Sequence, residues 1–236
     1  MSSQTTIQRW FRASREAPPR DPRMAEVWAQ PLTDWLVEHQ YVGGQSRVLD
    51  FGCGYFTAGA LLAPYVGAID GYDINRNALV EASALYPLTA KSASLFTERN
   101  AIPRRTYDVI LVSSVLQYLP HLEAVEETLR FLAECLAPRE GALIVVADVI
   151  PPSYSAAMDA LENLVAATRA GVLVPMIRHL ARCVLTGSEP ALLRLSPDAL
   201  SKAAGAAGLK ASRLDRNLTP SRRRLSFLLK PERAHG

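Results

Sequence analysis

Paired cysteines, a strong net charge and long apolar runs are all missing from this chain of 236 residues. The three cysteines, Cys53, Cys135 and Cys183, are scattered and form no CxxC pair. Their odd number and wide spacing argue against a disulfide framework or a zinc site, and they favour a reducing cytoplasm. The formal net charge of +3 is too small to indicate a nucleic-acid partner.

No run of about 18 uncharged apolar residues occurs, so we expect no transmembrane helix. The first residues are polar and lack the apolar core of a signal peptide. The motifs contain neither a metal-ligand constellation nor a supported Ser/His/Asp or Cys/His arrangement. The sequence therefore predicts a cytoplasmic protein without a metal site.

The composition, 49% hydrophobic and 21% charged residues, is that of an ordinary globular protein with a sizeable core. The length suits one domain with an appendage. We expect an N-terminal helical segment over residues 1–42, which includes the Pro/Arg-rich stretch "REAPPRDPR". Residues 43–236 would form the main domain, with a helical insertion at 153–195.

Strand and helix signals alternate along the main domain. Mostly continuous apolar runs predict buried parallel strands at 47–51, 67–72, 94–97, 107–113 and 142–149. Helical patterns lie between them at 57–65, 77–86 and 121–136. The last two predicted strands, 209–215 and 225–230, indicate an antiparallel hairpin. Together these elements predict an α/β, Rossmann-like, seven-stranded sheet, mostly parallel, with helices on both faces.

The first predicted strand ends in an acidic, glycine-rich turn, "VLDFGCGYF" from Val48. Ligands of open parallel sheets bind beyond the carboxyl ends of the strands, where Asp50, Gly52 and Gly54 would lie. The glycines let a ligand approach the backbone closely. The second strand ends in "GYDIN", which places Asp73 about twenty residues further on, where a carboxylate can accept hydrogen bonds from both hydroxyls of a ribose.

Two cofactor classes fit these features. A dinucleotide calls for G-x-G-x-x-G, but position 57 is Thr57, and Asp50 would face an anionic pyrophosphate. A ligand that carries an amino group and a sulfonium cation would instead be stabilised by Asp50. The plain alternative is that Asp50 and the glycines only form a tight turn between a strand and a helix.

Four stretches, "VLDFGCGYF", "GYDIN", "ERNAIP" and "YDVILVSSVLQYLPHLEAV", together resemble the class I S-adenosylmethionine-dependent methyltransferases over about residues 47–149. The resemblance implies S-adenosylmethionine as cofactor, with its methionine part at the glycine turn, its ribose at Asp73 and its adenine near Ile74 and Glu98. The implied cofactor site consists of Asp50, Gly52, Cys53, Gly54, Asp73, Ile74, Glu98 and Ser113. One departure is Phe56, which replaces the family's third glycine and is expected to reshape the turn.

A less specific resemblance concerns the acceptor. The pattern "VSSVLQYLP", "IVVADVIPP" and a late "SRRRLSFLLKP" is similar to methyltransferases of cell-surface polysaccharide and sugar biosynthesis. It implies O-methylation of a sugar, a glycan or a small metabolite. Two other functions stay open, a non-catalytic scaffold that binds S-adenosylmethionine and an NAD-dependent Rossmann enzyme.

Two residues are candidates for a catalytic base, should the acceptor be a hydroxyl. Asp148 lies near the end of the fifth strand, and His121 follows the fourth. Each has a plain alternative, since Asp148 can cap a turn before two prolines and His121 can begin a helix. The basic string at 222–224 is either a solvent-exposed loop or a site for a phosphate or carboxylate of the substrate.

The predicted insertion contains an apolar stretch, "LVAATRAGVLVPMIRHLARCVL", that is interrupted by arginines. We expect Pro175 to break it into two short helices. Because the insertion leaves the sheet where the substrate must bind, it is interpreted first as a lid. A homodimer interface and contact with an anionic membrane surface through a lipid-linked acceptor are the alternatives.

Overall fold

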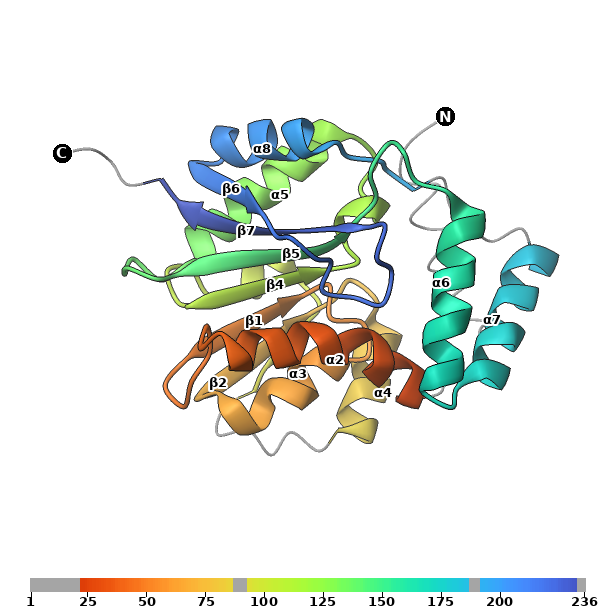
Figure 1. Cartoon of the computed structure of the whole chain (residues 1–236). Helices are drawn as coiled ribbons and strands as arrows, with labels where there is room; N and C mark the ends of the chain where they lie inside the picture. Colours follow the sequence, from red (N-terminus) through yellow and green to blue (C-terminus); the bar gives the residue numbers. More distant parts are fainter. Residues whose placement is uncertain (1–21, 87–92, 187–191, 233–236) are drawn as a thin grey trace.

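The computed structural model describes residues 22–86, 93–186 and 192–232, and within these ranges the chain forms a single seven-stranded sheet (Figure 1). Its strand order is β3-β2-β1-β4-β5-β7-β6. The strands are β1 (Arg47–Phe51), β2 (Ala68–Tyr72), β3 (Leu95–Phe96), β4 (Val109–Ser113), β5 (Leu143–Val149), β6 (Leu209–Arg213) and β7 (Leu225–Pro231).

The first five strands are parallel, and the last two are antiparallel to their neighbours. Strand β1 pairs with β2 and β4, and β4 pairs with β5, all in parallel. Strand β7 runs antiparallel to both β5 and β6, so the predicted C-terminal hairpin is confirmed. The pairing of β5 with β7 shifts register between Val146 and Val149, which gives β5 an irregular carboxyl end.

Helices cover both faces of the sheet, as the alternating pattern predicts (Figure 1). One face carries α2 (Pro22–Glu38), α3 (Thr57–Leu62) and α4 (Arg76–Leu85), which share a buried cluster with β1, β2 and β4. The other face carries α5 (Leu122–Cys135) and α8 (Pro197–Ala206). Short 3₁₀ turns, η1 (Ala63–Tyr65), η2 (Arg99–Ala101) and η3 (Leu116–Tyr118), complete the connections.

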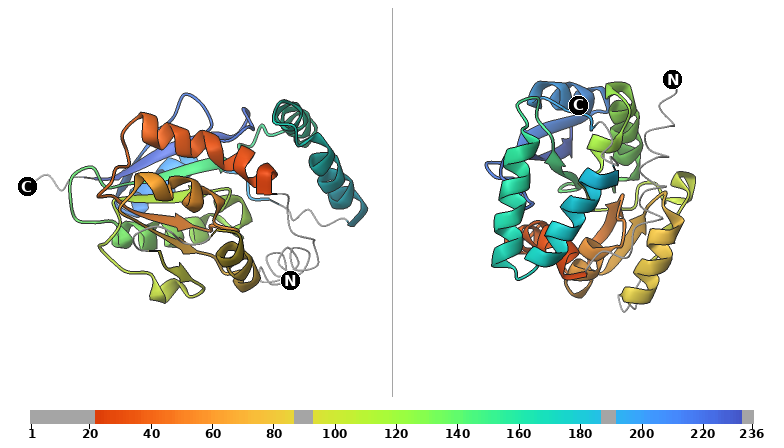
Figure 2. Two further views of the ribbon diagram at one scale, coloured as in Figure 1. Left: turned by 90° about the horizontal axis from the view of Figure 1, so that it is seen from below. Right: turned by 90° about the vertical axis from the view of Figure 1, so that its right-hand side faces the viewer.

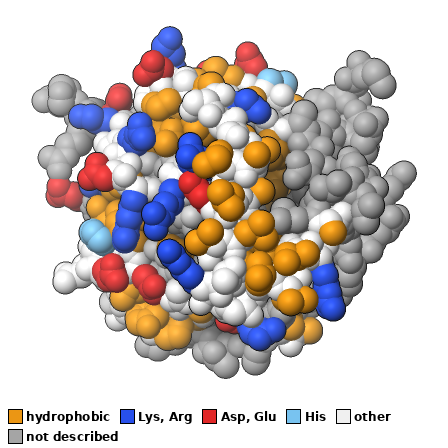
Figure 3. All heavy atoms as spheres, turned by 45° about the vertical axis from the view of Figure 1, so that its right-hand side comes forward, with side chains coloured by type: hydrophobic (Ala, Val, Ile, Leu, Met, Phe, Trp, Pro, Cys, Tyr) orange, Lys and Arg blue, Asp and Glu red, His pale blue; other side chains and the backbone are white. Residues whose placement is uncertain are grey.

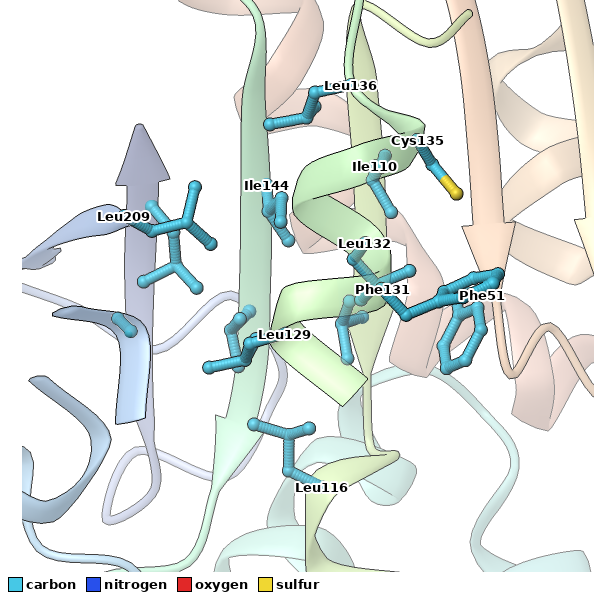
Figure 4. Close-up of a cluster of buried hydrophobic side chains, with 14 of the residues drawn as sticks. Phe51, Ile110, Leu116, Leu129, Phe131, Leu132, Cys135, Leu136, Ile144 and Leu209 are labelled. Atoms are coloured by element: carbon cyan, nitrogen blue, oxygen red, sulfur yellow. The ribbon is translucent and has the colours of Figure 1, made fainter. Parts of the chain in front are cut away.

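The larger core cluster lies between α5 and the middle of the sheet (Figure 4). Helix α5 places Leu129 and Leu132 against the sheet, where Ile110 and Ile144 meet them, and all four side chains are fully buried. Their spacing of three residues puts the two leucines on one face of the helix. Replacing one of them with alanine would cost about 2–5 kcal/mol of folding free energy, because the cavity cannot close completely.

The insertion between β5 and α8 forms two helices, α6 (Ala156–Arg169) and α7 (Leu173–Thr186). They stand beyond the edge where β1, β4 and β5 end and project from the body of the molecule (Figures 1 and 2). The break between them was predicted at the wrong residue. It lies at Gly171, whose φ of +71° favours glycine, while Pro175 lies in the first turn of α7, where proline is tolerated.

The N-terminal segment is described from Pro22 onward, and the remainder of the predicted segment 1–42 lies outside the described residues. Within the described ranges, none of the helices is long and apolar enough to cross a bilayer.

Candidate functional site

The glycine turn after β1 is held by backbone hydrogen bonds to the end of β2. The N–H groups of Gly52 and Cys53 donate to the carbonyl oxygen of Tyr72, at 2.7 and 3.0 Å. Gly52 has a φ of +77°, and a Cβ atom there would lie 2.4 Å from Cγ2 of Val115. Both the backbone conformation and the packing therefore require glycine at this position.

The second glycine of the turn is bound by Asp73 and is open on its outer side. The Gly54 N–H donates to Oδ2 of Asp73 at 2.8 Å, and the Asn75 N–H donates to Oδ1 at 2.7 Å. A Cβ atom on Gly54 would meet no other atom within 4 Å. Burial raises the pKa of Asp73, and the N–H groups of Asn75 and Gly54 oppose that shift. The turn thus presents exposed backbone at Gly54 beside the Asp73 carboxylate, whose position is fixed by its two hydrogen bonds.

Asp50 is a buried carboxylate with an unused oxygen. Its side chain is 4% exposed, and among the described residues no group hydrogen-bonds its Oδ2. Burial raises the pKa of Asp50 to about 7, while the Gly59 N–H lowers it and the nearby Asp73 carboxylate raises it further. A buried carboxylate in this state gains most from a cationic partner. The amino group of a methionine moiety has the charge that this oxygen requires, so the cofactor implied by the sequence fits the site.

Phe56 occupies the position of the third glycine without filling the turn. It keeps a left-handed backbone, with φ of 59°, at the N-cap of α3. Its ring is 1% exposed and lies against Gly59 and Gly71, where a Cβ atom would come within 2.2 and 2.7 Å of ring carbons. The two glycines therefore make room for the ring in the core. Phe56 was expected to reshape the turn. In the structure its ring instead lies in the core beneath the turn, packed against Gly59 and Gly71.

The other residues of the implied cofactor site lie at the same edge of the sheet. Ile74 follows β2 and is 52% exposed, Glu98 precedes η2 with an exposed side chain, and Ser113 ends β4. Because parallel strands end at one edge, these positions gather around the glycine turn. Cys53 is half-buried, and burial raises the pKa of its thiol well above the ordinary value, so it is not an activated nucleophile.

Asp148 is the centre of a hydrogen-bond network at the end of β5. The Ser114 hydroxyl and Nη1 of Arg224 donate to its Oδ2, at 2.6 and 2.7 Å. The Thr219 hydroxyl donates to its Oδ1 at 2.8 Å. Both Ser114 and Asp148 have positive φ values, 57° and 69°, which are strained for residues other than glycine. The network therefore holds two strained residues together on the side of the sheet where an acceptor would bind.

Arg224 also reaches the insertion. Its Nη2 donates to Oδ2 of Asp159 on α6 at 2.8 Å and lies 3.4 Å from the Tyr154 hydroxyl oxygen. Burial alone would lower the pKa of Arg224, but Asp148 and Asp159 outweigh it and raise that pKa above its usual value. The two interpretations of the basic string are therefore wrong for this residue. Arg224 is neither solvated nor free for a substrate anion, because two internal carboxylates occupy its guanidinium.

His121 begins α5. Its Nδ1 accepts a hydrogen bond from the Ala124 N–H at 3.3 Å and lies 3.0 Å from Oε2 of Glu123. The imidazole is more than half exposed, and the structure gives it the helix-capping position that the sequence offered as its plain alternative.

Two residues at this edge were missed by the sequence analysis. Asp159 gave no signal, because its partner Arg224 lies 65 residues away along the chain. Gln117, in η3, is 3% exposed, and within the described ranges its Oε1 finds no hydrogen-bond partner. A glutamine flanked by apolar residues directly after β4, in "SVLQYL", was the available signal. This unpaired amide oxygen, two residues after the Val115 side chain that packs on Gly52, is a candidate contact for a ligand.

Comparison with known proteins agrees with this geometry. Residues 8–187 match the family model described as "Methyltransferase domain". Among curated proteins, a region of 114 residues is 27% identical to part of "Probable non-canonical nonribosomal peptide synthetase (NRPS) CymA" of Salinispora arenicola. That match covers 45% of this chain and only 1% of the length of the synthetase.

Solved structures with the same fold include several methyltransferases. Magnesium protoporphyrin IX methyltransferase (ChlM) of Synechocystis with bound SAH is 18% identical, with a TM-score of 0.58, over 96% of this chain and 94% of that one. A SAM-dependent methyltransferase of Leishmania major is 14% identical, with a TM-score of 0.61, over 97% and 82%. DesVI of Streptomyces venezuelae is 17% identical, with a TM-score of 0.59, over 89% and 92%.

At these identities the solved structures establish the fold, while the family model covers well over half of the chain. The chain therefore belongs to the class I S-adenosylmethionine-dependent methyltransferase family.

Proposed function

We propose that this protein transfers a methyl group from S-adenosylmethionine to a hydroxyl of a sugar, a glycan or another small metabolite. The observation that carries the proposal is the buried Oδ2 of Asp50, which has no partner among the described residues and lies beside an open glycine turn. Family membership supports the same reading. The choice of a sugar acceptor is supported only by the resemblance of the late sequence motifs.

The chain's own residues divide the binding of the cofactor between them. Asp50 would accept the amino group, and the bare backbone at Gly54 would let the methionine part approach closely. Asp73 uses one lone pair of each carboxylate oxygen for a backbone N–H, which leaves the others for the ribose hydroxyls. Ile74 and Glu98 would meet the adenine, and Cys53 and Ser113 would complete the wall of the site. When bound, S-adenosylmethionine supplies a methyl group that the positive sulfur has already activated.

For such a transfer, orientation of the acceptor contributes more than proton removal. We propose that Asp148 acts as a positioning residue, because its oxygens are engaged by Ser114, Thr219 and Arg224. As a base it would first have to give up one of these partners. His121 is the more accessible candidate for the proton. Gln117 would hydrogen-bond the acceptor without taking a proton.

The helices α6 and α7 are proposed to cover the acceptor. They begin directly after β5, at the edge of the sheet that carries the glycine turn (Figure 1). A cover there excludes water and orders the acceptor. The scattered cysteines support a cytoplasmic location for the reaction.

Calorimetry with S-adenosylhomocysteine tests the proposal, with micromolar binding as the expected result. Asp73→Ala should weaken this binding by about 1.5–3 kcal/mol, because a charged hydrogen-bond acceptor is lost. Incubation of the protein with labelled S-adenosylmethionine and a panel of sugars, glycans and phenols should then yield a labelled product.

Three results would contradict parts of the proposal. If S-adenosylmethionine and its product both fail to bind, the assignment is wrong. A thermal shift with NAD alone would indicate a dehydrogenase, and Asp50 beside a pyrophosphate argues against that outcome. Binding without turnover on any acceptor would favour a scaffold.

A further inference from the structure

The helical hairpin made of α6 and α7 is attached to the rest of the protein by polar contacts. Arg224 binds Asp159, Nε of Arg223 lies 3.2 Å from Oε1 of Glu162, and the Ser221 hydroxyl lies 3.1 Å from Oδ1 of Asn163. One further contact is apolar. Met24 and Trp28 of α2 pack with residues at the junction of the two helices, namely Ala167, Val172 and Met176.

The opposite side of the hairpin is exposed and apolar. Among the described residues, nine large hydrophobic side chains are exposed, and five of them lie on these two helices. They are Met158, Leu161 and Val165 on α6 and Val174 and Ile177 on α7, with exposed fractions from 38% to 58%. Their spacing of three and four residues places each set on one helix face. Figure 3, with this side turned forward, shows hydrophobic side chains gathered in a patch.

The charges around this apolar face have one sign. Over residues 156–178 the only acidic side chains are Asp159 and Glu162, and both are paired with arginines of the loop before β7. The cations Arg169 and Arg178 are exposed. The face therefore offers apolar area together with positive charge, and its acidic groups are turned toward the protein.

We propose that this face of α6 and α7 binds the surface of an anionic lipid bilayer. Helices with exposed apolar residues beside arginines lie in the interfacial region of membranes, where anionic headgroups attract the cations. Each helix has 14 residues, a length of about 21 Å, which is too short to span a bilayer core of about 30 Å. A second copy of this chain is the less favourable partner, because a symmetric contact would bring like charges together. The inference goes beyond methyl transfer and does not depend on it.

Co-sedimentation of the full chain with lipid vesicles tests the proposal. Vesicles of phosphatidylcholine with about 30% phosphatidylglycerol should bind the protein, while phosphatidylcholine alone should bind it much less. The variant R169Q/R178Q should weaken binding by about 25-fold, since each cation near the surface contributes about fivefold. The variant L161D/V165D should abolish binding, because it places charge on the apolar face.

Matched controls come from exposed positions on other helices. V80D on α4 changes a side chain that is 65% exposed, and R130Q on α5 removes an exposed cation. Both controls should bind vesicles as the unaltered protein does. A cooperative urea-unfolding transition like that of the unaltered protein would show that L161D/V165D is folded. If this variant does not fold, R169Q/R178Q decides the test alone.

Equal binding to neutral and anionic vesicles, or binding to neither, would overturn the proposal. So would normal binding by R169Q/R178Q. A dimer in light scattering that L161D/V165D converts to a monomer, without vesicle binding by the unaltered protein, would show that this face joins two copies instead.

Discussion

Nη1 of Arg224 lies 2.7 Å from Oδ2 of Asp148, although 76 residues separate the two in the sequence. The same guanidinium binds Asp159 on its other side, and all three side chains are largely buried. The end of β5, the first turn of α6 and the residue just before β7 therefore meet at one cation. Arg224 thereby contacts the strained end of β5, fixes the loop before β7 and attaches the insertion to the sheet.

Replacing this cation should be costly. Arg224→Met leaves two buried carboxylates without their cationic partner, so we expect a loss of about 3–5 kcal/mol in the free energy of unfolding, measured by urea denaturation. Arg223→Met is the matched control, because its ion pair with Glu162 is half exposed and should contribute less than about 1 kcal/mol. Equal losses for the two variants would show that the buried network does not stabilise the fold.

The open side of Gly54 can be separated from its backbone strain. Gly54→Ala and Gly208→Ala each place a side chain at a positive φ, +52° and +72°, where the new Cβ atom meets no neighbour. Both should lose about 1–2 kcal/mol of stability. Only Gly54→Ala should weaken the binding of S-adenosylhomocysteine, by more than about tenfold, because the cofactor approaches the backbone there. If calorimetry finds equal affinities for both variants, the cofactor does not approach Gly54.

The ring of Phe56 and the absent side chain of Gly59 should be energetically coupled. Phe56→Ala should cost about 3–5 kcal/mol through the cavity it leaves. Gly59→Ala should cost about 1–3 kcal/mol in the unaltered protein, since its Cβ atom would overlap the ring. Combined with Phe56→Ala, however, Gly59→Ala should stabilise by about 1 kcal/mol, because alanine favours the helix. A double-mutant cycle by thermal or urea unfolding measures this reversal, and simple additivity would contradict it.

Cofactor affinity should depend on pH through Asp50. Burial raises its pKa to about 7 in the free protein, so below pH 7 this carboxyl is mostly protonated and cannot pair with an amino cation. The affinity for S-adenosylhomocysteine should therefore rise by up to about tenfold per pH unit as the pH approaches 7, and level off above it. Asp50→Asn should bind weakly with no such dependence in calorimetry from pH 5.5 to 8.

The same shift acts on stability with the opposite trend. In the unfolded chain Asp50 ionises at the ordinary carboxyl value, so between about pH 4 and 7 the folded protein without cofactor holds the additional proton. The stability that Asp50 contributes to the folded state is therefore present below about pH 4 and is lost as the pH rises from about 4 to 7. Asp50→Asn should remove that loss.

The sheet could be predicted from the sequence because its strands are nearly continuous apolar runs with clear breaks between them. The predicted ends of α3 and α5 agree with the structure to within a few residues, and Gly52 and Asp73 could be placed at the same edge from chain order alone. These features depend on local pattern and on the shared direction of parallel strands.

What could not be predicted depends on contacts between distant segments. Three consecutive arginines read as a solvated loop, and only the folded chain shows that Arg224 points inward to Asp148 while Arg223 stays at the surface. The packing of Phe56, at the start of α3, against Gly71 of β2 likewise joins two separate segments of the chain. The break at Gly171 was available from sequence, since a glycine after a helix commonly takes the left-handed conformation that ends it.

The hydrogen bonds of the glycine turn also bear on how fast the cofactor can come and go. The N–H groups of Gly52, Cys53 and Gly54 are already bound within the protein, to Tyr72 and Asp73. A ligand that meets a finished turn loses no affinity to ordering it, and its association waits for no local folding step. The rate at which S-adenosylhomocysteine is exchanged for S-adenosylmethionine would then depend on motions of the segments around the turn and not on the turn itself.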